Sequence, residues 1–119
     1  MANYTLSMQQ EIIRYRQRLH QLAEVSGLEI RTAAQIADYL QQFNPDELLK
    51  NVGGTGVIAV FKGAQKGPSV LFRAELDALP IPETCTLTYS SEDKETGHKC
   101  GHDGHMAILL GLAGLLAED

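Results

Sequence analysis

Residues 97–105 concentrate metal-binding side chains immediately before an apolar stretch, and this run constrains the chain more than any other segment. It reads GHKCGHDGH and holds three of the four histidines and one of the two cysteines. Thiolate, neutral imidazole and carboxylate are the side chains that bind zinc, and nickel, cobalt or manganese use overlapping sets. The run therefore predicts a divalent-metal site at the start of a helix.

The spacing within this run leaves the grouping of the ligands open. In an extended segment alternate side chains share a face, so His98, Cys100 and His102 converge there. On a helix, His102 and His105 converge instead. Gly101 permits a sharp bend between the two conformations.

The run has three other interpretations. In the first, it is a solvated loop in which Asp103 caps the following helix. Alternatively it holds one structural zinc through His98, Cys100, His102 and His105, although four ligands within eight residues are crowded compared with ordinary zinc spacings. In the third interpretation Cys100 is a nucleophile, although no oriented partner for it is evident.

Composition places the chain among ordinary globular proteins and excludes several partners. The 119 residues are 44% hydrophobic and 21% charged, with a net charge of −5, which suits one modest domain. Because lysine and arginine form no cluster, we expect neither nucleic acid nor an anionic membrane as a partner. No leader or long apolar span is evident, so a cytoplasmic location is the default expectation. The two cysteines predict no disulfide framework, and Cys85 is expected to be a free, partly buried thiol.

Apolar periodicity predicts two helices and then two strands. Ser7 is expected to cap the first helix, which should end near Gly27, and His20 within it is expected to be a structural or surface residue. The second helix is expected over residues 29–43, followed by an ambiguous segment, residues 47–52. The continuously apolar residues 57–61 predict a strand buried on both faces, and residues 69–76 predict a second strand that pairs with it as a hairpin.

Two carboxylates lie toward the end of the second predicted strand, and both can support metal chemistry. Glu75 lies within this strand and Asp77 follows it, where loops and ligands of α/β sites gather. There they can fix ligand imidazoles by hydrogen bonding. A helix N-terminus also favours the thiolate of Cys100. Together these features point to metal-assisted hydrolysis with a separate carboxylate as general base.

The apolar stretch at residues 106–117 predicts a helix buried on most sides. Only Glu118 and Asp119 follow it. We therefore expect this chain to be part of a longer protein, or its last helix to be covered by a partner. That partner could be a second copy of the chain in a homo-oligomer.

Two ordered motifs resemble one known family. Residues 71–81 (LFRAELDALPI) and residues 98–105 (HKCGHDGH) look like the N-terminal part of the metal-dependent amidohydrolases. This family includes hippurate hydrolase, N-acyl-L-amino-acid amidohydrolase and the indole-acetyl-amino-acid hydrolases. Residues 18–20, 24–33 and 53–57 fall in the family's order, so the resemblance spans almost the whole chain.

The resemblance implies an α/β fold, the N-terminal part of a zinc-exopeptidase-like catalytic domain with helices packed on a mixed sheet. Residues 1–119 would be a partial catalytic domain without the family's lid and dimerisation domain. The implied cofactor is a pair of divalent metals (Zn, Mn, Ni or Co), and the implied substrates are small N-acyl amino acids such as hippurate or N-acetyl amino acids.

The family's motif positions imply roles for individual residues. Its Cys-Gly-His ligand pair falls on Cys100 and His102, and the aspartate before Ala-Leu-Pro falls on Asp77, a supporting group. Residues expected around the ligands without a defined role are Glu75, His98, Asp103 and His105.

The chain departs from the family pattern at several points. Glu75 stands where aspartate is usual, and Ala23 stands where proline is usual. The family's glutamate pair and later histidine ligands lie downstream of anything in this chain, so the isolated chain is expected to be inactive. An alternative of another class is a truncated, non-catalytic relative that acts as a metal-binding or interaction module.

Overall fold

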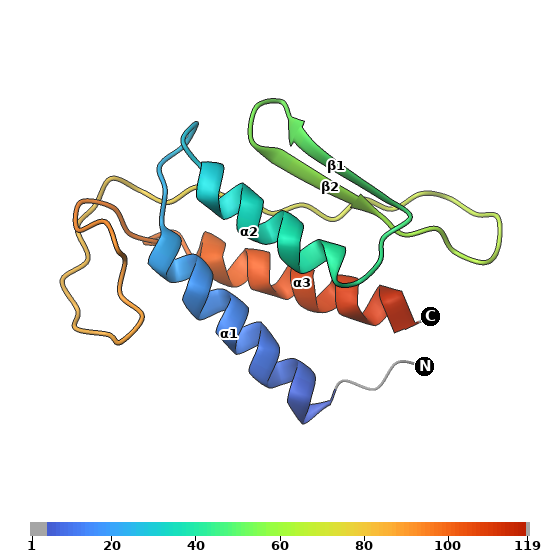
Figure 1. Cartoon of the computed structure of the whole chain (residues 1–119), viewed down its shortest axis with the longest axis horizontal. Coiled ribbons are helices and arrows are strands. Elements are labelled where there is room, and N and C mark those ends of the chain that lie inside the picture. The colour runs from blue at the N-terminus through green and yellow to red at the C-terminus, as the bar shows by residue number, and fades with distance from the viewer. Residues whose placement is uncertain (1–4, 119) are drawn as a thin grey trace.

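The structure is a computed structural model that describes residues 5–118. This part of the chain forms three helices and a small sheet (Figure 1). In chain order the elements are α1 (Leu6–Leu22), α2 (Ile30–Gln41), β1 (Glu47–Val52), β2 (Gly56–Val60) and α3 (His102–Glu118). The predicted α/β class is confirmed. Within the described range the sheet has two antiparallel strands. The parallel component of the expected mixed sheet is limited to one isolated bridge, between Val25 and Ala78.

The ends of α1 differ from the prediction. Thr5 caps the helix instead of Ser7, because its backbone is extended and its hydroxyl accepts the N–H of Met8 at 3.2 Å. The helix ends at Leu22, where Ala23 departs from helical angles. Gly27, with φ 85°, forms the turn before α2 and is not the C-terminus of α1.

β1 and β2 form a hairpin that replaces the predicted one. Glu47 pairs with Val60 and Leu49 with Ile58, so the ambiguous residues 47–52 are a strand. The tight connection uses positive φ angles at Gly53 and Gly54, and Asn51 has left-handed backbone at the irregularity in β1 between Leu49 and Val52. Closing this short loop costs less entropy than closing the longer loop to residues 69–76. β2 is half-buried along its length, so the prediction of burial on both faces is also wrong.

Residues 69–76 are extended, but they pair with no strand in the described part of the chain. The side chains of Val70, Leu71 and Phe72 are 72%, 81% and 59% exposed. The radius of gyration, 14.9 Å, exceeds the value of about 13.5 Å expected for a compact domain of this length. The segment therefore carries strand-like residues without a neighbouring strand.

Backbone hydrogen bonds hold the end of this extended segment on both sides. The N–H of Ala78 donates to the carbonyl of Glu24 at 2.7 Å, and Leu79 exchanges two hydrogen bonds with Gly97 at 3.0 and 3.1 Å. These bonds place Asp77 beside the segment that leads into α3.

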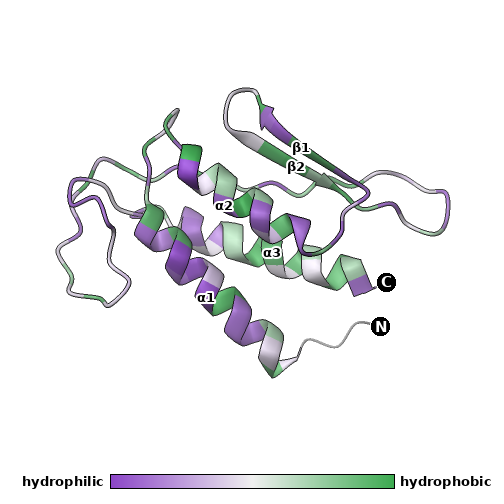
Figure 2. Ribbon diagram, in the orientation of Figure 1, coloured by the Kyte–Doolittle hydropathy of each residue, from purple (hydrophilic) through white to green (hydrophobic). Residues whose placement is uncertain are grey.

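α3 packs against α1 and α2 through one face. Leu19 of α1 and Leu110 of α3 are fully buried at the centre of the core. A Cβ on Gly111 would lie 2.6 Å from Ile12 Cδ1, so a glycine lets α1 and α3 approach closely. Figure 2 shows how apolar α3 is along its length, yet Ile108 is 66% exposed. The expected burial on most sides is therefore limited to one face.

No helix between residues 5 and 118 combines the length and the apolar character needed to cross a bilayer. Both cysteines are free, as predicted, but Cys85 is exposed and not partly buried.

Glu24 caps the N-terminus of α2 from outside the helix. Its Oε1 accepts the N–H and the hydroxyl of Thr32 at 2.6 and 2.7 Å, and its Oε2 accepts the N–H of Arg31 at 3.2 Å. Thr32 is fully buried. These bonds satisfy N–H groups that the first turn of a helix leaves unpaired.

We predict that Glu24→Ala lowers the free energy of unfolding by about 1–2 kcal/mol, the range of a lost helix cap. Urea denaturation followed by circular dichroism measures this change. The matched control is Glu95→Ala, an exposed glutamate. Equal stability of the two variants would contradict the capping role.

Candidate metal centre

The metal-motif segment is held by an isolated bridge at Gly97 and turns at Gly101. Gly101 has φ 81°, a conformation that favours glycine, and α3 begins at the next residue, His102. The N–H of His105 donates to the Gly101 carbonyl at 3.1 Å and closes the first helical turn. The predicted bend therefore lies at Gly101, and Asp103 belongs to the first turn of α3 instead of capping it.

His102 is oriented by Asp77. Its Nδ1 lies 2.8 Å from the Asp77 carbonyl oxygen and 3.0 Å from Asp77 Oδ1. Both neighbours accept hydrogen bonds, so Nδ1 carries the proton and Nε2 of the neutral ring keeps its lone pair. A carboxylate behind an imidazole is the usual support of a metal-binding histidine.

A second carboxylate faces the other ring nitrogen of His102. Glu75 Oε2 lies 3.8 Å from His102 Nε2, while Glu75 Oε1 pairs with Arg73 at 2.8 Å. Hydrogen bonding from its own backbone N–H, together with Arg73 and His102, holds the pKa of Glu75 below its ordinary value. Glu75 is therefore a carboxylate anion at the nitrogen that remains free.

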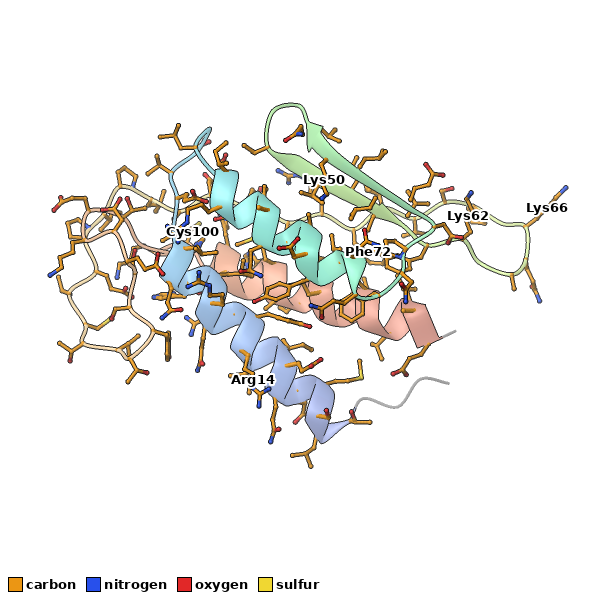
Figure 3. All side chains as sticks on the ribbon, in the orientation of Figure 1. Arg14, Lys50, Lys62, Lys66, Phe72 and Cys100 are labelled. Carbon is orange, nitrogen blue, oxygen red and sulfur yellow. The ribbon has the colours of Figure 1, made fainter. Side chains whose placement is uncertain are left out.

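Cys100 is exposed, one residue before the turn. Figure 3 locates it near the N-terminal end of α3. The described residues contain no group of three or more His, Cys, Asp or Glu side chains close enough to hold one metal ion. His98, Cys100, His102 and His105 therefore do not form a ready-made zinc site in the described part of the chain, and a metal centre here needs further ligands or a small shift of the side chains.

The other two histidines of the run point elsewhere. His98 is 7% exposed, and neither of its ring nitrogens has a hydrogen-bond partner. Its ring lies 6.2 Å from that of His20, and burial is the main reason that its pKa is lowered. His105 is exposed, with its ring 5.9 Å from that of His102.

A buried polar network ties α1 to the metal-motif segment, and sequence reasoning missed it. His20 Nδ1 lies 2.8 Å from Asp103 Oδ2, and His20 Nε2 contacts Glu83 Oε1. Arg16 Nε also pairs with Asp103 Oδ2 at 2.9 Å. His20 is therefore a structural residue, which is one of the two roles (structural or surface) that the sequence predicted for it. Its partners lie 63 and 83 residues away, and no local pattern identifies them.

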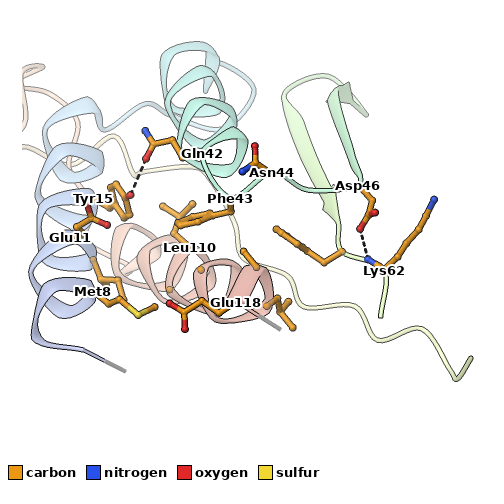
Figure 4. A pocket seen from close by; sticks show the side chains of 16 residues that line it. Met8, Glu11, Tyr15, Gln42, Phe43, Asn44, Asp46, Lys62, Leu110 and Glu118 are labelled. Atoms are coloured by element: carbon orange, nitrogen blue, oxygen red, sulfur yellow. Dashed lines mark hydrogen bonds between the residues drawn. The ribbon is translucent and has the colours of Figure 1, made fainter. Parts of the chain in front are cut away.

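The groove in Figure 4 lies toward the opposite end of α3. Its volume is about 500 Å³, and it is lined by Met8, Tyr15, Phe43 and Leu110 among others. The Lys62 N–H donates to Asp46 at its rim. The groove contains no histidine or cysteine, so the metal-ligating chemistry remains at the N-terminal end of α3.

Glu83, which contacts His20 in the buried polar network, makes the stability of the fold dependent on pH. Burial by itself would raise the pKa of Glu83, but the Ser91 N–H at 2.6 Å and His20 outweigh it and hold the pKa below its ordinary value. The unfolded chain then binds the proton more tightly than the folded chain, so stability falls as the pH drops through this pKa.

We predict that Glu83→Gln lowers the free energy of unfolding by about 2 kcal/mol at neutral pH. The difference from the wild type should stay constant at neutral pH and shrink in acid, as the pH falls from the ordinary pKa of a glutamate through the lowered pKa of folded Glu83. Urea titrations across pH 3–7 measure it. A difference that does not change with pH would contradict the role of the ionised carboxylate.

Comparison with known proteins finds similar chains among amidohydrolases and peptidases. The chain is 41% identical over 117 residues to the N-acetyl-L-cysteine deacetylase of Bacillus subtilis (strain 168), covering 95% of this chain and 27% of the relative. It is 40% identical over 108 residues to the N-acyl-L-amino acid amidohydrolase of Geobacillus stearothermophilus, covering 91% of this chain and 29% of the relative. No protein family model matches.

A solved structure agrees with these similarities. Bacillus subtilis YXEP, described as a dinuclear metal binding peptidase from the M20 family, superimposes with a TM-score of 0.90 at 37% identity. The match covers 97% of this chain and 32% of that chain. The chain thus spans less than a third of the length of its relatives.

Proposed function

This chain is a relative of the metal-dependent N-acyl-amino-acid amidohydrolases, and we propose that it contributes Cys100 and His102 to a divalent-metal centre of their kind. The observation that carries the proposal is the orientation of His102. Asp77 accepts a hydrogen bond from His102 Nδ1–H and leaves the Nε2 lone pair free beside the Glu75 carboxylate. Such support is typical of a histidine that binds metal.

The proposed reaction is hydrolysis of the amide bond of small N-acyl amino acids, such as hippurate or N-acetyl amino acids. A divalent metal at such a centre supplies Lewis acidity, which polarises the scissile carbonyl and makes water acidic enough to attack near neutral pH. In this chain, Asp77 holds the His102 ring in one tautomer. Gly101, with its left-handed backbone, makes the bend between Cys100 and His102 at the start of α3.

Two ligands do not complete a two-metal centre, so the proposal assigns the other ligands and the general base to residues outside this chain. Residues 1–119 would then be part of a catalytic domain, with a lid and dimerisation domain elsewhere in a protein of the relatives' length. The isolated chain would bind metal weakly and would not turn over substrate. A thiol, an imidazole and carboxylates suit zinc, manganese, nickel or cobalt, and the proposed location is the cytoplasm.

A non-catalytic role as an interaction module is the second candidate. It is supported by the exposed apolar residues Val70, Leu71 and Phe72 and by the exposed outer face of α3. Native mass spectrometry of the chain separates the two candidates: the metal-centre proposal expects a species that binds Zn²⁺ or Co²⁺. An oligomer that binds neither ion would favour the interaction module.

We predict that Cys100→Ala and His102→Ala each reduce the affinity of the chain for Co²⁺ by at least tenfold, because each removes a ligand. Asp77→Asn should cost about 10–100-fold, since it removes the support of the imidazole. Isothermal titration calorimetry measures the affinities, and Asp38→Asn on the exposed surface of α2 is the control.

In a protein of the relatives' length, the same Cys100→Ala and His102→Ala changes should abolish release of free amino acid from N-acyl amino acids. Turnover equal to that of the wild type in either variant would contradict the ligand assignment.

A further inference from the structure

We propose that Glu75 is itself a metal ligand, and not a carboxylate that supports the imidazole from behind, as the sequence suggested. This inference rests on the proposed function, because it concerns the same centre. It adds the Glu75 carboxylate beside His102 to the donors that this chain offers, and it assigns different tasks to Glu75 and Asp77.

The position of Glu75 relative to His102 carries the inference. Its Oε2 lies 3.8 Å from His102 Nε2, the nitrogen that Asp77 leaves free. Two donors that bind one zinc ion at bond lengths near 2.1 Å and a tetrahedral angle lie about 3.4 Å apart. A shift of a few tenths of an ångström therefore brings both donors onto one ion.

Arg73 prepares the carboxylate for this role. It binds Glu75 Oε1 at 2.8 Å and leaves Oε2 directed at His102. The two residues are separated by one position, so their side chains lie on the same face of the extended segment. Because the Glu75 side chain is 42% exposed, it adjusts to an ion without disturbing the core.

Asp77 approaches the other side of the same ring. It contacts Nδ1 through both its carbonyl and its carboxylate. A carboxylate on Nδ1 orients the imidazole, whereas a carboxylate beside Nε2 faces the ion that Nε2 would bind. The two carboxylates therefore occupy positions that correspond to support and to ligation.

Side-chain length separates ligation from simple charge attraction. Aspartate carries the same charge as Glu75, but its side chain is one methylene shorter and reaches less far toward His102 Nε2. If Glu75 only provides negative charge, or only pairs with a protonated His102, Glu75→Asp keeps that effect. If it ligates, Glu75→Asp withdraws the oxygen and Glu75→Gln weakens it as a donor.

Co²⁺ titration of the whole chain, followed by visible absorption and calorimetry, tests the inference. We expect Glu75→Asp and Glu75→Gln each to lower Co²⁺ affinity by about tenfold or more and to change the ligand-field bands that report coordination number. The Cys100 charge-transfer band should persist in both variants. Glu95→Gln, the control with the same change of charge, should bind as the wild type does.

The outcomes that overturn the inference differ from those that overturn the proposed function. Wild-type affinity and bands in Glu75→Asp, or in both Glu75 variants, overturn ligation by Glu75 and leave the Cys100–His102 centre intact. Absence of Co²⁺ binding by the wild type overturns both proposals. Unchanged binding in Cys100→Ala and His102→Ala overturns the proposed function. Thermal unfolding of each variant checks that the fold is retained.

Discussion

The arrangement of the candidate centre depends on the backbone hydrogen bonds around Ala78 and Leu79. These bonds join the end of the extended segment to Glu24 on one side and to Gly97 on the other. Side-chain contacts alone would leave this segment free to slide, whereas three backbone bonds set its register. Because the register is set, Asp77 meets His102 although the two residues are 25 positions apart.

A second constraint lies beneath the centre, where polar groups are buried in place of apolar ones. His20 bridges Asp103 and Glu83, and the arrangement is fully satisfied when both ring nitrogens carry protons. Removing any one partner leaves a buried polar group without its hydrogen bond, which costs more than the bond contributes. The network therefore fixes the start of α3 relative to α1 more specifically than apolar packing does.

The apolar surface outside the centre is consistent with the small share of its relatives' length that the chain covers. Val70, Leu71 and Phe72 have the composition of a buried strand but are exposed, and their backbone pairs with no strand in the described range. The same composition misled the prediction of a hairpin: apolar residues show that a strand is favoured, but they do not identify its partner. The β1–β2 pairing was decided by the short turn at residues 53–55.

The sequence by itself determined the presence of the three helices and the α/β class, and it named the residues that are proposed for the candidate centre. Helical periodicity and the concentration of metal-binding side chains at residues 97–105 are local features, and local features can be recognised in a sequence. Only the tertiary structure decided that Glu75 and Asp77 approach opposite nitrogens of His102, that His98 turns inward, and that Asp103 pairs with His20. These contacts join residues far apart in the chain, and their distances follow from how α1, α3 and the extended segment pack together.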